Sequence, residues 1–252
     1  MDTLNELAAD ERTARLILAV ASEPGDAVTG RMIRTVGASE TIARVLADEV
    51  PPRPDGDTWQ RRLAPRIDLA QTRRVLAETE RPGMRVLIPG DAEWPAGVDA
   101  PGDGAPVALW AKGDIGLLSR PVWDRLTVTG ARASTAYGEH VTTELVQSAV
   151  ADSRVVFSGG AYGIDGAAHR AALASDGSTV AVLAGGLDRP YPVGHADLFT
   201  RVGKDGLLLS ELPPCAAPTK WRFLQRGRPL APPPRGGPPP GGGDRSRPPP
   251  PP

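Results

Sequence analysis

The 252-residue sequence is poor in cysteine and in long apolar runs, and each shortage excludes a class of protein. Cys215 is the only cysteine, so the chain has no disulfide framework and no thiolate metal site, and we expect a reducing compartment. No apolar run approaches the roughly 20 residues that cross a bilayer, and Met1 to Asp10 lacks the pattern of a signal peptide. We therefore expect a cytoplasmic protein without a membrane partner.

Lysine and aromatic residues are also scarce. The chain has three lysines and 4% aromatic residues, and its formal net charge is −1. From Lys220 onward seven basic residues stand against Asp244 alone, whereas the preceding part is net negative. A nucleic-acid site on this chain must therefore be a local patch of arginines, because the overall field does not attract phosphate. Stacking of bases on aromatic side chains would be partial at best.

A glycine-rich turn is the most informative motif. The apolar run at 154–157 is followed by S-G-G-A-Y-G-I-D-G-A-A-H at 158–169, which predicts a strand, a tight turn and a helix. Such a turn brings backbone N–H groups and the positive end of the helix dipole close to an anion, so phosphate is the expected ligand. The spacing is not that of a dinucleotide site, and no Gly-Lys-Ser/Thr of a Walker loop follows. We therefore expect neither NAD nor ATP, and no cofactor.

A second glycine turn lies one strand earlier. The apolar run at 126–129 is followed by G-A-R-A-S-T-A-Y-G at 130–138. If the two strands are parallel neighbours, both turns lie at the carboxyl edge of the sheet, where ligands of α/β folds bind. Arg132 would then place a guanidinium in the cleft. A long polyanion fits two adjacent turns better than a single nucleotide does.

Four motifs stand in an order that resembles one family. They are T-G-x-R at 129–132, S-G-x-A-x-G-I-D-x-x-A-H at 158–169, A-G-G-L-D-x-x-Y-P at 184–192 and F-x-x-R-x-R at 223–228. Together they resemble the DNA-processing protein A (DprA/Smf) family over roughly Met84 to Arg228. The resemblance implies a non-catalytic protein that binds single-stranded DNA, protects incoming DNA and loads the recombinase RecA during natural transformation. It also implies a homodimer.

The candidate DNA-binding residues come from both turns and from the basic cluster that corresponds to the family's Arg-Asn-Arg motif. They are Gly130, Arg132, Ser158, Gly159, Gly160, Gly163, Lys220, Arg226 and Arg228. Asp165 and His169 are four residues apart on one helix face, but no third ligand is placed beside them. We expect Asp165 to cap N–H groups and order the loop, with His169 packed behind it, and we assign no catalytic and no metal residue.

The pattern of elements predicts the fold class. From residue 126 onward, short apolar strands alternate with amphipathic helices at about 136–151, 164–175 and 195–203. This alternation predicts an α/β, Rossmann-like parallel sheet with helices on both faces, over 81–228. Residues 1–80 predict a small helical domain similar to the family's SAM or helix-hairpin-helix module. We expect it to serve packing or a partner rather than a site.

Two departures from the family pattern concern function. Val193 stands where the family often has a basic residue, so we expect one phosphate contact to be lost and the affinity to be weaker. Gly227 stands where the family has Asn, inside the motif at which the resemblance stops. Residues 229–252 hold 12 prolines and 5 glycines, which predicts a disordered tail. This tail is either a Pro-rich interaction segment or the product of a truncated or frame-shifted gene, and we favour the second.

Two alternatives to a DNA-binding function stay open. One is a nucleotide-cleaving enzyme similar to phosphoribohydrolases, although their Pro-Gly-Gly-x-Gly-Thr loop is missing from this sequence. The other is a damaged family member without function.

Overall fold

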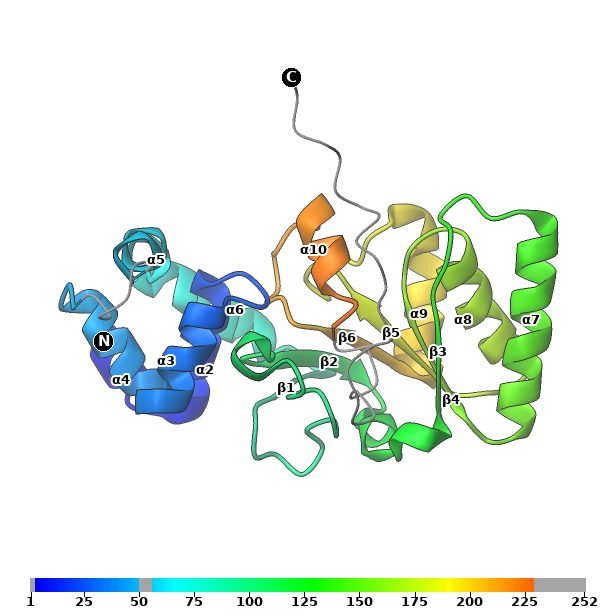
Figure 1. Ribbon diagram of the computed structural model, residues 1–252, viewed down its shortest axis with the longest axis horizontal. Helices are drawn as coiled ribbons and strands as arrows, with labels where there is room; N and C mark the ends of the chain where they lie inside the picture. Colours follow the sequence, from blue (N-terminus) through cyan, green and yellow to red (C-terminus); the bar gives the residue numbers. More distant parts are fainter. Residues whose placement is uncertain (1–2, 50–55, 229–252) are drawn as a thin grey trace, which may run out of the picture.

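The computed structural model describes residues 3–49 and 56–228, with a helical bundle packed beside an α/β domain (Figure 1). In this part of the chain the elements before the sheet are α1 (Leu4–Leu7), α2 (Glu11–Ala21), α3 (Ala27–Val36), α4 (Ala38–Leu46), α5 (Gly56–Leu63), the 3-10 turn η1 (Ala64–Arg66) and α6 (Leu69–Thr79). The predicted tail at 229–252 lies outside the described residues.

The bundle has a core and caps of its own. Ile17, Ile42 and Trp59 are almost fully buried in one hydrophobic cluster, and the Trp59 indole N–H donates to the Thr29 hydroxyl at 2.9 Å. Aspartates begin three helices by accepting hydrogen bonds from first-turn N–H groups: Asp10 for α2, Asp26 for α3 and Asp68 for α6. The expected helical N-terminal part is therefore present, and no helix among the described residues is long and apolar enough to span a membrane.

The sheet is mixed rather than wholly parallel. Its strands are β1 (Met84–Leu87), β2 (Leu109–Gly113), β3 (Arg125–Val128), β4 (Val155–Gly159), β5 (Thr179–Leu183) and β6 (Leu207–Ser210), in the order β1-β2-β6-β5-β4-β3. The strands β3 to β6 are parallel, and β2 joins them antiparallel beside β6, with β1 at the edge (Figure 1). The α/β class and the positions of these four parallel strands are as predicted.

The helices of the α/β domain cover one face of the sheet, which corrects the expectation of helices on both faces. The helices α7 (Ala136–Ala151), α8 (Ile164–Ala174) and α9 (Ala196–Asp205) pack on the face formed by Val156, Ala181 and Leu208. The strand order β3-β4-β5-β6 advances in one direction, and right-handed crossovers then place each connecting helix on the same side. Helices on both faces would require the strand order to reverse.

The opposite face is covered by connections instead. Phe157, Val180 and Leu209 pack there against Val98 from the β1–β2 connection and Leu118 from the 3-10 turn η3 (Ile115–Ser119). The shorter 3-10 turns are η2 (Gly102–Gly104), η4 (Val122–Asp124) and η5 (Val193–His195), and the described chain ends with α10 (Lys220–Gln225). This last helix lies between the bundle and the glycine turns (Figure 1).

Candidate nucleic-acid interface

The two glycine turns meet at the carboxyl edge of the sheet, as the sequence predicts. Val128 at the end of β3 pairs with Ser158 on β4, so both turns leave the sheet side by side. The Ile164 N–H donates to the Ala131 carbonyl at 3.1 Å. Gly163 has a φ of +76°, and a Cβ there would lie 2.2 Å from the same carbonyl oxygen. Only glycine fits this contact, so the turns interlock.

The inner side of the second turn, where side chains of Gly159 and Gly160 would lie, is filled by protein groups. A Cβ on Gly159 would lie 2.3 Å from the Arg226 guanidinium carbon, and one on Gly160 would lie 2.6 Å from the Phe199 ring. On this side the two glycines therefore admit an arginine and an aromatic ring, and their role as phosphate ligands stays a prediction. The Ala161 N–H is also occupied, because it donates to the Asp165 carboxylate at 3.3 Å.

Ser158 also differs from its expected role. Its side chain is fully buried, and the hydroxyl donates to the Val128 carbonyl at 2.7 Å. The strand alternation places the Ser158 side chain on the same helix-covered face of the sheet as Val156, away from the carboxyl edge. Ser158 therefore ties β4 to β3, and its side chain does not reach a ligand at the surface.

The first glycine turn presents open basic surface. Gly130 and Arg132 are exposed, and no described residue forms an ion pair with Arg132. In the described chain, the backbone N–H groups of 130–133 also lack a hydrogen-bond acceptor. The Arg132 guanidinium lies over the Phe223 ring of α10, 4.7 Å from its centre, so a cation–π contact holds the charge in place. Lys220 on the same short helix is exposed as well.

Arg226 stands behind this surface as a buried, paired charge. Its guanidinium donates to the Asp165 carboxylate at 2.7 Å, with the two side chains 11% and 2% exposed. The same guanidinium lies 5.0 Å from the centre of the Phe223 ring. Burial lowers the pKa of Arg226, and the Asp165 carboxylate acts in the opposite direction. Asp165 therefore fixes both the glycine loop and this arginine.

Arg228 points into the protein rather than toward the cleft, which corrects its assignment to DNA. It donates to Glu211 at 2.5 Å, and both side chains are largely buried. Burial raises the pKa of Glu211 to about 7, and the Arg228 charge partly offsets that rise. Gly25 of the bundle lies directly against the Arg228 guanidinium. Arg222 likewise turns away from the turns and forms two 2.9 Å hydrogen bonds with Glu23.

Two histidines support the second turn from below. His169 is fully buried, and its Nδ1 lies 2.8 Å from the Thr179 hydroxyl. Burial lowers the pKa of His169 to about 3, so the ring is neutral near pH 7. His195, which the sequence did not single out, has its Nδ1 3.2 Å from the Gly160 carbonyl and its ring edge-on to Tyr162. Among the described residues no group of three His, Cys, Asp or Glu could hold a metal ion.

The sequence comparison decides the family. A family model described as DNA recombination-mediator protein A matches residues 85–232. This chain belongs to that family. A DprA relative from Mycobacterium tuberculosis is 40% identical over 220 residues, covering 83% of this chain and 55% of the relative. The DNA processing protein DprA of Bacillus subtilis is 31% identical over 207 residues, covering 82% and 64%. The chain thus spans between half and two thirds of the length of these DprA relatives.

Solved DprA structures share the fold. DNA processing protein A from Streptococcus pneumoniae superposes with a TM-score of 0.66 at 27% identity, covering 91% of this chain and 74% of that one. DprA from Helicobacter pylori, whose structure is described as showing a unique single-stranded DNA binding mode, gives 0.51 at 29% identity. That match covers 57% of this chain and 62% of the other.

Proposed function

We propose that this chain binds single-stranded DNA at the carboxyl edge of the sheet, through the first glycine turn, Arg132 and Lys220. The observation that carries the proposal is the position of Arg132. Its guanidinium is exposed and free of carboxylates in the described chain, and it is held over Phe223 beside the N–H groups of 130–133. This arrangement suits the phosphates of a flexible strand and gives little sequence preference. Gly163 and Gly130 serve by letting the two turns interlock.

Arg226 contributes a fixed positive charge behind this surface rather than a flexible arm. Because Asp165 already neutralises much of that charge, we expect Arg226 to position Phe223 and the turn rather than to add a full phosphate contact. Tyr191 packs edge-on to Phe223 with ring centres 5.9 Å apart and is half-exposed, so it offers a base an apolar surface.

The first experiment measures fluorescence anisotropy of labelled oligo-dT and of a matched duplex. We expect the single strand to bind more tightly than the duplex, with an affinity that falls with salt. Arg132→Ala should weaken binding by about fivefold to tenfold and reduce the salt slope by about 0.7. Arg154→Ala is the matched control, because this exposed arginine precedes β4 at the opposite edge of the sheet. Equal losses in both variants would contradict the proposed site.

We further propose that the chain is a non-catalytic recombination mediator that protects incoming single strands and loads RecA during natural transformation. The family membership supports the mediator role, and the resemblance described above supplies RecA and transformation. The test is RecA-dependent strand exchange on DNA covered by a single-strand-binding protein. We expect this chain to shorten the lag before exchange. An unchanged lag, with DNA binding intact, would refute loading and leave the DNA site standing.

A further inference from the structure

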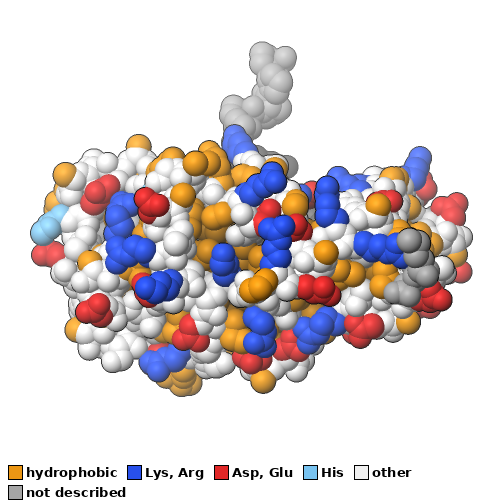
Figure 2. All heavy atoms as spheres, turned by 180° about the vertical axis from the view of Figure 1, so that it is seen from behind, with side chains coloured by type: hydrophobic (Ala, Val, Ile, Leu, Met, Phe, Trp, Pro, Cys, Tyr) orange, Lys and Arg blue, Asp and Glu red, His pale blue; other side chains and the backbone are white. Residues whose placement is uncertain are grey.

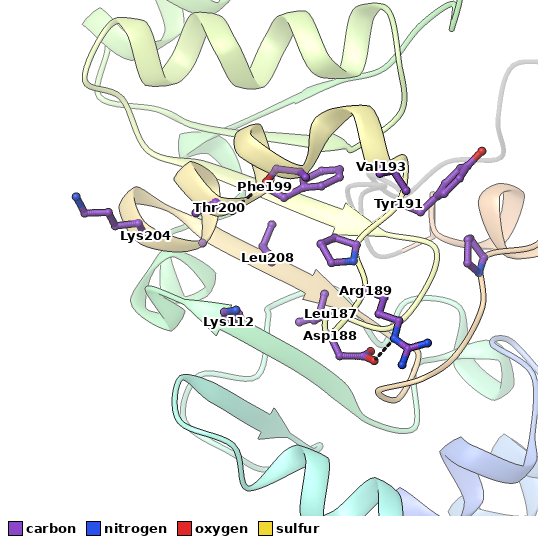
Figure 3. A pocket seen from close by; sticks show the side chains of 14 residues that line it. Lys112, Leu187, Asp188, Arg189, Tyr191, Val193, Phe199, Thr200, Lys204 and Leu208 are labelled. Atoms are coloured by element: carbon purple, nitrogen blue, oxygen red, sulfur yellow. Dashed lines mark hydrogen bonds and ion pairs between the residues drawn. The ribbon is translucent and has the colours of Figure 1, made fainter.

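A groove that the candidate interface does not use runs along α9. It encloses a cavity of about 630 Å³ between α9, the strands β2 and β6, and the connection at 187–193. Figure 3 shows Lys112 and Lys204 at one end, Tyr191 and Val193 at the other, and apolar side chains between them. The floor is formed by Leu187, Phe199 and Leu208, which belong to one buried hydrophobic cluster.

The charge of the groove favours an anion. Lys112, Arg189 and Lys204 line it, and within the described chain neither lysine forms an ion pair. The single carboxylate on the lining is Asp188, which accepts the Cys215 N–H at 2.8 Å and lies 3.9 Å from Arg189. Asp188 is therefore engaged within the protein, and the free charge of the groove is positive. On the face shown in Figure 2, Lys and Arg side chains alternate with Asp and Glu side chains around exposed apolar surface, so that face carries both signs of charge.

The groove is continuous with the candidate DNA interface. Tyr191 lines the groove and also packs against Phe223, the ring that lies under Arg132. Val193, at the same end, is 76% exposed, so an extended chain could pass from one site to the other over apolar surface. The ten residues of α9 give the groove a length of about 15 Å.

We propose that the α9 groove continues the path of single-stranded DNA beyond the glycine turns. This inference rests on the proposed function. Bases of the emerging strand lie against Tyr191, Pro190 and Val193, and the following phosphates approach Lys204 and Lys112. Every base has an apolar face and every nucleotide carries one phosphate, so this mixture of apolar floor and cationic rim suits a strand of any sequence.

The test compares short and long oligonucleotides. Lys112→Gln/Lys204→Gln should bind dT5 like the wild type but bind dT20 about tenfold more weakly, with a salt slope reduced by about 1.4. Arg154→Gln/Arg201→Gln is the charge-matched control, because Arg201 lies on α9 but does not line the groove. We expect this control to bind both oligonucleotides like the wild type.

A gain-of-charge variant provides an independent measurement that does not depend on removing a native side chain. Thr200 is exposed on the groove side of α9, so Thr200→Lys should raise the affinity for dT20 about threefold and leave dT5 unchanged. Unchanged dT20 affinity in both groove variants would overturn the groove proposal, as would equal effects on dT5 and dT20. In either case a loss on Arg132→Ala would still support the glycine-turn site.

A wild type that binds neither oligonucleotide would overturn both proposals together. Competition provides the last outcome. If an acidic peptide binds the wild type through Lys112 and Lys204 while dT20 affinity is insensitive to both lysines, the groove is a peptide site and the DNA path is refuted.

Discussion

The first glycine turn and the segment 226–228 contain the same residue type in opposite circumstances. Arg132 is exposed, rests on Phe223 and has no carboxylate beside it in the described chain. Arg226 and Arg228 are largely buried, each against a buried carboxylate. The sequence motifs predict a phosphate contact for all three arginines. Arg226 and Arg228 are instead each paired with a carboxylate inside the protein, which leaves less of their charge for a phosphate. The lesson is that a basic residue counts as a phosphate contact only after its buried acidic neighbours are known.

The strongest way to break this comparison is to remove the carboxylate that holds Arg226. Asp165→Ala leaves a guanidinium buried without a partner, so we expect the free energy of unfolding to fall by about 3–5 kcal/mol. Denaturant unfolding followed by circular dichroism measures it. The control is Asp197→Ala, which removes an exposed acid from the first turn of α9. A variant as stable as the wild type would mean that the pair contributes nothing to the fold.

A second prediction concerns the pH dependence of the Arg228–Glu211 pair. The pKa of Glu211 rises to about 7 in the folded state, so stability from this carboxyl is lost as pH rises from about 5 to 7. His169 acts oppositely, because its lowered pKa, about 3, makes stability fall as pH drops below 6.5. The comparison of wild type with Glu211→Gln separates the two.

From pH 5 to pH 7.5 the unfolding free energy of the wild type should fall by about 2 kcal/mol relative to that of Glu211→Gln. The reason is that only the wild type has a buried carboxyl that must ionise over this range. Urea unfolding at several pH values measures the difference. Parallel curves for the two proteins would show that the Glu211 pKa is ordinary in the folded state.

Two basic residues on α10 sharpen the comparison within one helix. Lys220 is exposed and Arg222 is paired with Glu23 of the bundle. Lys220→Ala should weaken oligo-dT binding about threefold to fivefold and leave stability unchanged. Arg222→Ala should cost about 1 kcal/mol of stability and leave oligo-dT affinity unchanged. Anisotropy measures the oligo-dT affinity of both variants, and thermal unfolding measures their stability. If Arg222→Ala lost affinity and Lys220→Ala lost stability, Arg222 would be the DNA contact and Lys220 the structural residue.

The smallest effect is expected at Val193, which lies exposed where the family often carries a basic residue. Val193→Lys adds one positive charge beside Tyr191, so oligo-dT affinity should rise about twofold to fourfold at low salt. Val193→Gln is the control for a longer side chain without charge. An affinity that Lys does not raise, measured by the same anisotropy assay, would place the strand elsewhere.

The sequence predicted the local elements well because each strand is a short apolar run. The runs at 154–157 and 179–183 became β4 and β5 nearly as expected, and both glycine turns follow their strands. The expectation of helices on both faces was wrong. The side on which a helix packs depends on the order of the strands in the sheet, and no single segment of the sequence determines that order. The antiparallel pairing of β2 with β6 also joins distant parts of the chain.

At the site, residue types were readable but their partners were not. The sequence predicted Arg132 in an open turn because it follows Gly130 directly after a strand. It gave no signal that Glu211 would receive Arg228, or that Asp165 would receive an arginine 61 residues later. Such ion pairs depend on the tertiary fold, which brings together residues that are far apart in the sequence. Ser158 was misassigned for a related reason, because a hydroxyl inside a strand follows the strand's alternation.

The ties of α10 make the candidate interface depend on two distant parts of the chain. Arg222 meets Glu23 across 199 residues of sequence, and Arg226, one helical turn later, meets Asp165. The helix that carries Phe223 is therefore held by the bundle through one arginine and by the glycine loop through the other. The ring under Arg132 keeps its place because both the bundle and the α/β domain hold α10.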